Sequence, residues 1–371
     1  GTSSTILLVT TGSGTIAVNA ALDAGLNDGD VYLTSAGSIT GSGLITGYTG
    51  SLVAQTGLAA NANVSQGFST ISSAAGDISV ANVWGIAVPN AITTTGNVSL
   101  TAGQDIALTN AITASGKTVT LTANGGGIEG GSLVTANTVD LNATAGIGST
   151  SAVNLAAFFV SADTTSGAID INNMSGTAVS VTSLTTTGGA AITFDQTGAG
   201  GIGLDGNVTS TTGTVTISSQ QGISRTSGTI TAGRVDLDAA TGIGTATALK
   251  LAASTISADS TAGMINLANA LGTAVTVTSL TTKSTVDPGG DLITFSQSGG
   301  GTVTFNGVSS AGSDPGYGAI KLTNAGGGIT IASSGVSTAG TSSTILLVTT
   351  GSGTIAVNAA LDAGLNDGDV Y

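Results

Sequence analysis

Residues 86–121 read IAVPNAITTTGNVSLTAGQDIALTNAITASGKTVTL and contain one phrase twice. In both copies the pattern I-A-[VL]-x-N-A-I-T is followed by a glycine turn and then by an alternating V-x-L segment. The second copy follows the first at an offset of 20 residues, which becomes 21 after a one-residue insertion. Repeats of this length are typical of solenoids, in which each copy forms one unit of a stack.

The V-x-L segment recurs along the chain at a nearly constant spacing. Its recurrences begin at Ile78, Val98, Val119 and Val139, with steps of 20, 21 and 20 residues. Successive side chains of a strand point to opposite faces, so the first and third residues of each segment share a face. We therefore expect Val119 and Leu121 to point into a core and Thr120 to point outward.

Each period of about 20 residues has room for three short strands separated by Gly, Asn and Ser. One period cannot bury its own apolar face, so the chain must coil and stack each turn, here called a rung, on the next. Parallel hydrogen bonds between rungs then satisfy the backbone. The sequence predicts an all-β fold, a right-handed parallel β-helix (β-solenoid) with three faces and about 20 residues per turn.

Two longer periods lie above the rung. Residues 135–184 align with residues 231–280 at an offset of 96, and the match resumes at an offset of 101 after an insertion at residues 283–288. The internal copies thus span about 135–207 and 231–308. The insertion contains Pro288 and charged residues, and we expect it to form an outward loop.

Residues 1–32 and 340–371 are identical, at an offset of 339. We expect residues 1–339 to be one tandem unit of about 17 rungs and residues 340–371 to begin the next unit in the same conformation. At roughly 4.8 Å between rungs, one unit would be about 80 Å long. Residues 5–9, TILLV, are as apolar as an interior rung, so we expect each end to meet another unit, either in a covalent array or by end-to-end stacking.

The composition excludes several functional classes. Only 7% of the residues are charged, with a net charge of −14, and the six Lys and Arg residues are scattered, so no nucleic-acid footprint is visible. His and Cys are both absent, which removes disulfides and Cys/His metal sites. No apolar run approaches the roughly 18 residues of a membrane span.

The phrases of residues 92–100 and 96–123 closely resemble the repeat regions of filamentous haemagglutinin-like exoproteins. These are very large bacterial adhesins exported by two-partner secretion. The resemblance implies a right-handed parallel β-helix, secretion, and a role at the cell surface or outside the cell. The exact long-range recurrence is more regular than the drifting repeats of that family, which favours a fibre-forming member.

The densest acidic stretch is DAGLNDGD at residues 23–30, repeated at residues 362–369. Oxygen atoms for Ca²⁺ could come from Asp23, Asn27, Asp28 and Asp30. The spacing matches neither the EF-hand loop nor the Gly- and Asp-rich calcium repeat, and Asn-Asp-Gly-Asp is ordinary turn chemistry. We favour a plain loop and predict no metal, cofactor or catalytic residue.

The sequence also offers candidates for a catalytic carboxylate site and for a carbohydrate-binding surface. Asp236 and Asp238 share one strand face, as do Asp140 and Asn142, but no basic or His partner is apparent, so we predict that the chain is not an enzyme. Exposed aromatic rings could stack on carbohydrate, with packing at a corner as the alternative. The candidates are Trp84, Tyr32, Tyr48 and Tyr317.

Together these features favour a structural protein that forms an extracellular fibre, sheath or filament from tandem units. The alternative is the shaft of a large secreted adhesin whose ligand-binding part lies outside this segment. The expected partner is another unit of the same protein. Contact with a cell surface or with carbohydrate is compatible with either role.

Overall fold

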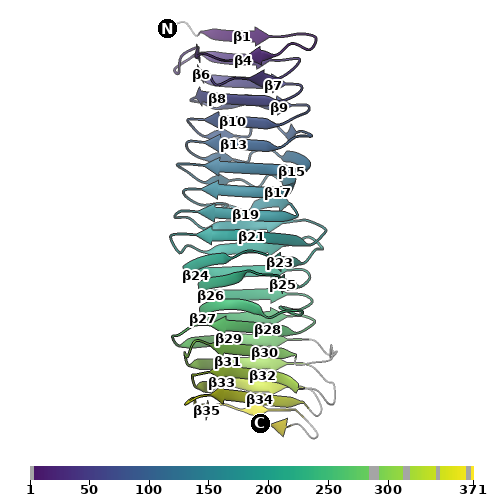
Figure 1. Cartoon of the computed structure of the whole chain (residues 1–371), viewed down its shortest axis with the longest axis vertical. Coiled ribbons are helices and arrows are strands. Elements are labelled where there is room, and N and C mark those ends of the chain that lie inside the picture. Colours follow the sequence, from purple (N-terminus) through teal and green to yellow (C-terminus); the bar gives the residue numbers. More distant parts are fainter. Residues whose placement is uncertain (1–3, 284–291, 312–317, 340–342, 365–368) are drawn as a thin grey trace. The chain divides into compact units, whose positions relative to one another are not determined.

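The computed structural model describes residues 4–283, 292–311, 318–339, 343–364 and 369–371 (Figure 1). Every regular element among these residues is a β-strand. The strands are parallel and stack into a β-solenoid of about 16 turns with roughly 22 residues per turn. The predicted all-β solenoid is therefore confirmed, with slightly longer turns than expected, and its right-handed sense stays a prediction.

The chain divides into two compact units, Gly1–Ser175 and Gly176–Tyr371. The strands of the first unit are β1 (Thr5–Val9), β2 (Ile16–Ala17), β3 (Leu22–Asp23), β4 (Asp30–Thr34), β5 (Ile39–Thr40), β6 (Leu44–Gly47), β7 (Thr49–Ala54), β8 (Leu58–Val64), β9 (Phe68–Ser73), β10 (Ile78–Asn82), β11 (Ile86–Ala87), β12 (Ile92–Thr93), β13 (Val98–Ala102), β14 (Ile106–Ala107), β15 (Ile112–Ala123), β16 (Ile128–Glu129), β17 (Val134–Ala143), β18 (Val153–Ala156), β19 (Phe159–Thr164) and β20 (Ile169–Asn173).

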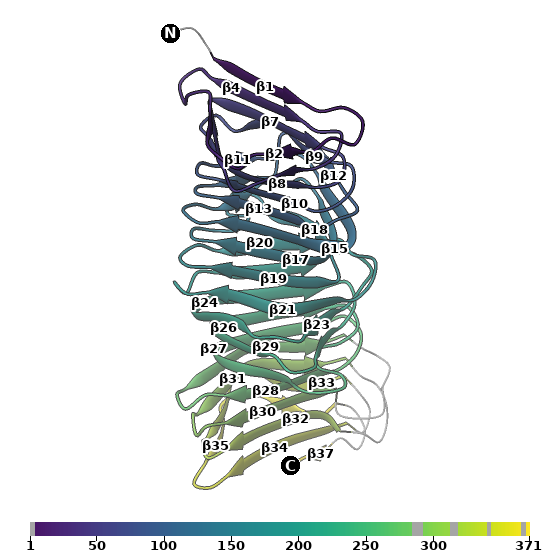
Figure 2. The ribbon, with the colours of Figure 1, turned by 45° about the horizontal axis from the view of Figure 1, so that its top comes forward.

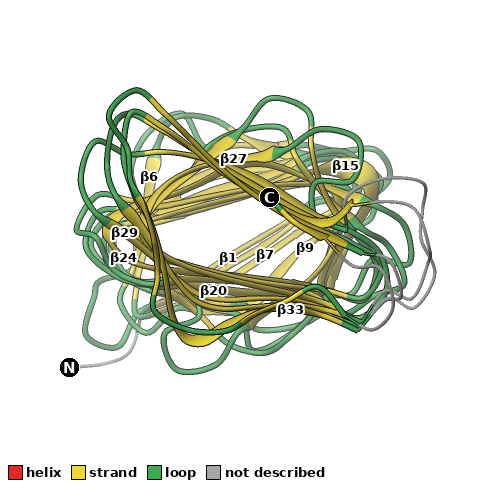
Figure 3. Cartoon of the chain, turned by 90° about the horizontal axis from the view of Figure 1, so that it is seen from below, coloured by secondary structure: helices red, strands yellow, loops and turns green. Residues whose placement is uncertain are grey.

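The strands of the second unit are β21 (Val179–Thr186), β22 (Ile192–Gln196), β23 (Ile202–Leu204), β24 (Val208–Ser219), β25 (Ile223–Arg225), β26 (Thr229–Ala239), β27 (Leu249–Ser260), β28 (Ile265–Ala270), β29 (Val275–Thr282), β30 (Ile293–Ser298), β31 (Val303–Ser310), β32 (Gly318–Ala325), β33 (Ile329–Thr338), β34 (Thr344–Thr350), β35 (Ile355–Val357), β36 (Leu361–Asp362) and β37 (Asp369–Val370). Seen along the stack, the connecting loops lie outside the strands (Figure 3).

A rung of the first unit contains three strands, as predicted. The rung β10–β11–β12 is followed by β13, β14 and the start of β15, and each strand pairs in parallel with its equivalent one rung away. In Figure 1, β10, β13, β15 and β17 follow one another in the stack, and Figure 2 shows the same part of the chain from a second side. Polar backbone groups of these strands are thus paired between rungs, which allows the rung to be buried on its inner side.

The predicted aliphatic ladder is present in the predicted register. Val98 pairs with Val119, which pairs with Val139, and all three side chains are buried. Leu121 is likewise fully buried, whereas Thr120 is only half-buried on the outer face. The alternation of the sequence therefore assigns inside and outside correctly along this column.

The two internal copies share hydrogen bonds as well as sequence. The Asn173 amide accepts from Ala157 N at 3.0 Å and donates to Ala157 O at 3.1 Å. At the same positions plus 96, Asn269 accepts from Ala253 N at 2.9 Å and donates to Ala253 O at 3.1 Å. Each buried amide thereby pairs with a backbone group that the strand ladder leaves open.

The insertion at residues 283–288 lies, apart from Lys283, outside the described residues. Its effect on the rung is visible, because Ile265 pairs with Ile293 across a longer stretch of chain than separates the partners of other rungs. The strands on both sides of the insertion keep their parallel pairing, for example Leu280 with Val308.

The identical segments 1–32 and 340–371 have matching local structure. Thr5 pairs with Asp30, and Thr344 pairs with Asp369, at the same positions of the repeat. The left-handed glycines also coincide, with φ of 69° at Gly12 and 77° at Gly351. The expected equality of conformation is observed at these described positions, whereas residues 1–3, 340–342 and 365–368 lie outside the described part of the chain. The division into units 1–339 and 340–371 stays a prediction.

The buried ladder predicts a strong contrast between neighbouring positions. Val119→Asp would place a charge in a dry stack and should lower the free energy of unfolding by several kcal/mol. Thr120→Asn should be nearly neutral, because Thr120 faces outward. Thr120→Asp is a poorer control than it looks from the sequence, since Thr120 pairs with Asp140 and like charges would then be adjacent. Denaturant unfolding of the two variants measures the contrast, and equal losses would contradict the register.

Candidate functional site

The acidic loop at residues 23–30 uses its carboxylates in local hydrogen bonds. Asp23 Oδ1 accepts from Gly25 N at 2.9 Å, which closes a turn. Asp30 accepts from the hydroxyl of Thr49 in the next rung at 2.6 Å and from the hydroxyl of Tyr32 at 3.3 Å. The two carboxylates thus stabilise the loop and the ladder next to it.

The second copy of this loop shows the same contacts. Asp362 Oδ1 accepts from Gly364 N at 3.0 Å, and Asp369 Oδ2 accepts from the Tyr371 hydroxyl at 3.1 Å. Residues 365–368, which include the second Asn-Asp pair, lie outside the described residues. Across the described part of the chain, no group of three or more Asp or Glu side chains is arranged to hold a metal ion.

The outer face of the second unit carries a longer polar column. Register partners along it are Asp195, Ser218, Asp238, Asp259, Thr281, Ser309, Ser337 and Asp362. Two shallow grooves of about 470 and 420 Å³ lie along this column and share Thr281 and Lys283 among their lining residues.

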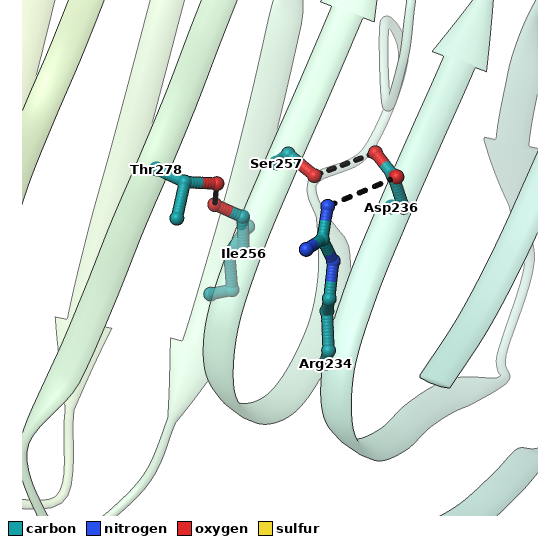
Figure 4. A network of polar contacts seen from close by, with 5 residues as sticks. All are labelled: Arg234, Asp236, Ile256, Ser257 and Thr278. Carbon is teal, nitrogen blue, oxygen red and sulfur yellow. Dashed lines mark hydrogen bonds and ion pairs between the residues drawn. The ribbon is translucent and has the colours of Figure 1, made fainter. Parts of the chain in front are cut away.

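Beside the column, a small network of side chains links two neighbouring rungs (Figure 4). Arg234 Nη2 lies 3.3 Å from Asp236 Oδ2, and the Ser257 hydroxyl donates to Asp236 Oδ1 at 2.5 Å. The equivalent pair in the first unit is Ser161, which donates to Asp140 at 2.7 Å. Outward carboxylates are therefore satisfied mainly by hydroxyls of the next rung.

Sequence reasoning correctly places Asp236 and Asp238 on one face but misses the cation beside them. Arg234 precedes Asp236 by two residues on the same strand, so the alternation alone would have placed them together. The ion pair is exposed and should contribute at most about 1 kcal/mol. The expectation of no enzymatic activity stays a prediction.

Asp238 in this column has a raised pKa. Partial loss of hydration raises its pKa above the ordinary value. Neighbouring carboxylates raise it further, namely Asp236, Asp259 and Asp195. Asp238 and Asp259 are direct register partners, so two like charges stand opposite each other on adjacent rungs.

The predicted aromatic candidates are not brought together. Trp84 is 37% exposed at a corner, and its indole Nε1 donates to Asn63 Oδ1 at 2.9 Å. Tyr32 is half-buried and Tyr48 is partly exposed, whereas Tyr317 lies outside the described residues. The adjacent rings of Phe158 and Phe159 are both exposed to the same extent, 44%, although strict alternation would turn one of them inward.

The like-charge pair yields a pH-dependent prediction. Asp238→Asn should raise the free energy of unfolding at neutral pH by up to about 1 kcal/mol, because it removes the repulsion with Asp259. A raised folded-state pKa means that the native state binds the proton more tightly than the unfolded state. The repulsion is therefore present above that pKa and is relieved as the pH falls through it, so the gain should shrink in acid.

The first internal copy supplies the control for this experiment. There Asn142 stands where the second copy has Asp238, and it pairs with Asp163. Asn142→Asp should lower the denaturation midpoint at neutral pH and have less effect in acid. An Asp238→Asn gain that is independent of pH would show that charge repulsion is not its cause.

Within the described residues, no helix is long and apolar enough to cross a membrane. Comparison of the chain with protein families, curated proteins and solved structures found no match.

Proposed function

We propose that this chain is a structural protein, a segment of an extracellular fibre built from tandem β-solenoid units. The observation that carries the proposal is the duplicated rung of residues 1–32 and 340–371. The two copies are covered on opposite faces. The second copy shows which strand covers the segment from the preceding rung, and the first copy shows which strand covers it from the following rung.

The first copy is open on the side where β1 lies. Among the described residues, β1 pairs only with β4, and Leu8 is 37% exposed. In the second copy the equivalent strand β34 is covered by β32, with Leu322 paired to Leu347, and Leu347 is only 7% exposed. The inward residue of this strand is thus buried once a preceding rung is in place.

The second copy is open on the other side. Ile355 in β35 is 42% exposed. Its equivalent Ile16 in β2 is only 7% exposed, because Ile39 of the following rung pairs with it. The same duplicated segment therefore accepts a rung on each face in one register, as continuous stacking of successive units requires.

A stack of this kind suits a mechanical role. Its core is a column of aliphatic side chains, and its backbone groups are paired rung by rung, so stability grows with each added rung. The resemblance of residues 96–123 to secreted adhesin repeats supports a location outside the cell. The same features suit the shaft of a surface adhesin, which the exposed rings of Trp84 and Phe159 favour as the second candidate.

The fibre proposal predicts axial growth with a defined repeat. At roughly 22 residues per turn and about 4.8 Å per rung, the tandem unit of residues 1–339 gives an axial repeat on the order of 75 Å. Electron microscopy or fibre diffraction of the native assembly measures it. Particles that associate side by side, with no axial repeat near this value, would contradict the proposal.

Variants at two neighbouring residues distinguish end-to-end stacking from non-specific hydrophobic association. Leu8 points inward on the open face, whereas Leu7 points outward and is the more exposed of the two, at 63%. Leu8→Asp should abolish end-to-end association and Leu7→Asp should largely preserve it. Equal effects, or a larger effect at Leu7, would indicate non-specific hydrophobic contact.

A further inference from the structure

The single Glu of the chain holds a loop of the next rung. Glu129 Oε1 accepts from Ser149 N at 3.0 Å, and Oε2 accepts from Thr150 N at 3.0 Å and from the Thr150 hydroxyl at 2.8 Å. Successive backbone N–H groups that point to one side form an anion-binding concavity, and hydrogen bonds to a charged acceptor are the stronger kind. We name these donors the carboxylate seat of the first copy.

The second internal copy contains the same loop at residues 244–246. Gly148 and Gly244 both adopt a left-handed conformation, with φ of 70° and 67°. Gly148 N donates to Ile128 O at 2.8 Å, and Gly244 N donates to Ile223 O at 2.8 Å. The backbone enters the two loops alike, so the seat of the second copy consists of the next two amides, those of Thr245 and Ala246.

Among the described residues, no carboxylate accepts from the amides of this second seat. Ile128 bridges to Ile147 and Ile223 bridges to Ile243, so the residue after Ile223, Ser224, holds the position of Glu129. The Ser224 hydroxyl donates instead to Ile202 O at 3.1 Å. Within the described residues, Thr245 N and Ala246 N donate to no protein group, and both residues are exposed. The donors that bind a carboxylate in the first copy therefore face solvent in the second.

The charge around the seat also reverses between the copies. The first copy has Glu129, Gly130, Asn154 and Asp170, where the second has Ser224, Arg225, Lys250 and Asn266. The formal charge of these four positions changes from −2 (two acids) to +2 (two bases). The chain has only six Lys and Arg residues, so two of them at one corner is a marked local excess.

Arg225 and Lys250 are distant in sequence but lie at the same corner. Arg225 Nε donates to Gly228 O at 2.6 Å, and the following residue, Thr229, is the register partner of Lys250. Asp205 lies on the preceding rung, and its backbone oxygen accepts from the hydroxyl of Ser227, two residues after Arg225. Hydrogen bonds from Ser180 and Thr226 lower its pKa, so this carboxylate is ionised and already bound by two hydroxyls.

We propose that the corner formed by Thr245, Ala246 and the cations Arg225 and Lys250 binds a carboxylate group. This carboxylate does not come from the residues beside the loop. The carboxylate oxygens would accept from the two amides, as those of Glu129 do in the first copy, and the two cations favour its negative charge. The ligand is either a small free carboxylate or an acidic side chain of a second copy. The inference does not depend on the fibre proposal.

The test is a titration of ¹⁵N-labelled protein with sodium acetate, followed by NMR, with sodium chloride at equal ionic strength as the reference. We expect saturable shifts of the Thr245 and Ala246 amide signals. The signals of Ser149 and Thr150 should not respond, because Glu129 already occupies their seat. Shifts that do not saturate, or that chloride reproduces, would overturn the proposal.

Two reciprocal variants use the copies as matched controls. Ser224→Glu places a carboxylate beside the open seat and should abolish the acetate response of Thr245 and Ala246. Glu129→Ser should create a new saturable response at Ser149 and Thr150, which tests the seat even if Ser224→Glu fails to fold. An unchanged response in Ser224→Glu, or none in Glu129→Ser, would show that the loop is not an anion seat.

A dilution series distinguishes the two sources of the carboxylate. If a second copy supplies it, the Thr245 and Ala246 signals should shift with protein concentration in the absence of acetate, and Ser224→Glu should remove that dependence. If the ligand is a free carboxylate, the signals should be independent of protein concentration and respond only to acetate. Concentration-dependent shifts that persist in Ser224→Glu would place the contact elsewhere and contradict the proposal.

Discussion

The structure depends on one constraint, that an apolar rung can be kept dry only by another rung. The inner side chains of β13, such as Val98 and Leu100, are buried because the rungs on either side cover them. The same neighbours accept the backbone hydrogen bonds of the strand, so burial and pairing come from a single contact. Removing a neighbouring rung would remove both the apolar burial and the backbone hydrogen bonds. The exposed Ile355 shows the loss of burial at an open face.

This constraint fixes the inside of the rung and leaves the outside free to vary. In the two internal copies the inward Val139 and Val235 are the same residue type and are fully buried. The outward positions differ, with Asn142 in one copy and Asp238 in the other. Differences in charge and hydrogen bonding are therefore confined to the outer faces and corners, where a substitution leaves the ladder intact. Any specific chemistry of this protein must arise there.

The limits of prediction from the sequence follow the same division. The period and the alternation suffice to place Val119 inside and Thr120 outside, because both depend only on the pleat of a strand. They do not by themselves give the lengthened step between Ile265 and Ile293, which the change of offset from 96 to 101 between the internal copies indicates, since a corner can grow without disturbing the ladder. They also miss the seat of Glu129, which forms between residues of successive rungs. Its formation depends on how each corner turns and how far a side chain reaches, and neither is periodic.

In the proposed fibre, a weak site on the outer face would contribute to binding through its repetition, which a single unit does not provide. A seat with two backbone donors, the exposed Lys250 and the half-buried Arg225 should bind a single carboxylate weakly, because water and salt compete for these groups. Tandem units would present the seat again once in every unit, on a backbone too rigid to alter the spacing. A polymer or a neighbouring fibre that carries carboxylates at a matching spacing could engage several seats together, and the later contacts would form at high effective concentration. The regular ladder would then determine avidity, although none of its buried residues touches the ligand.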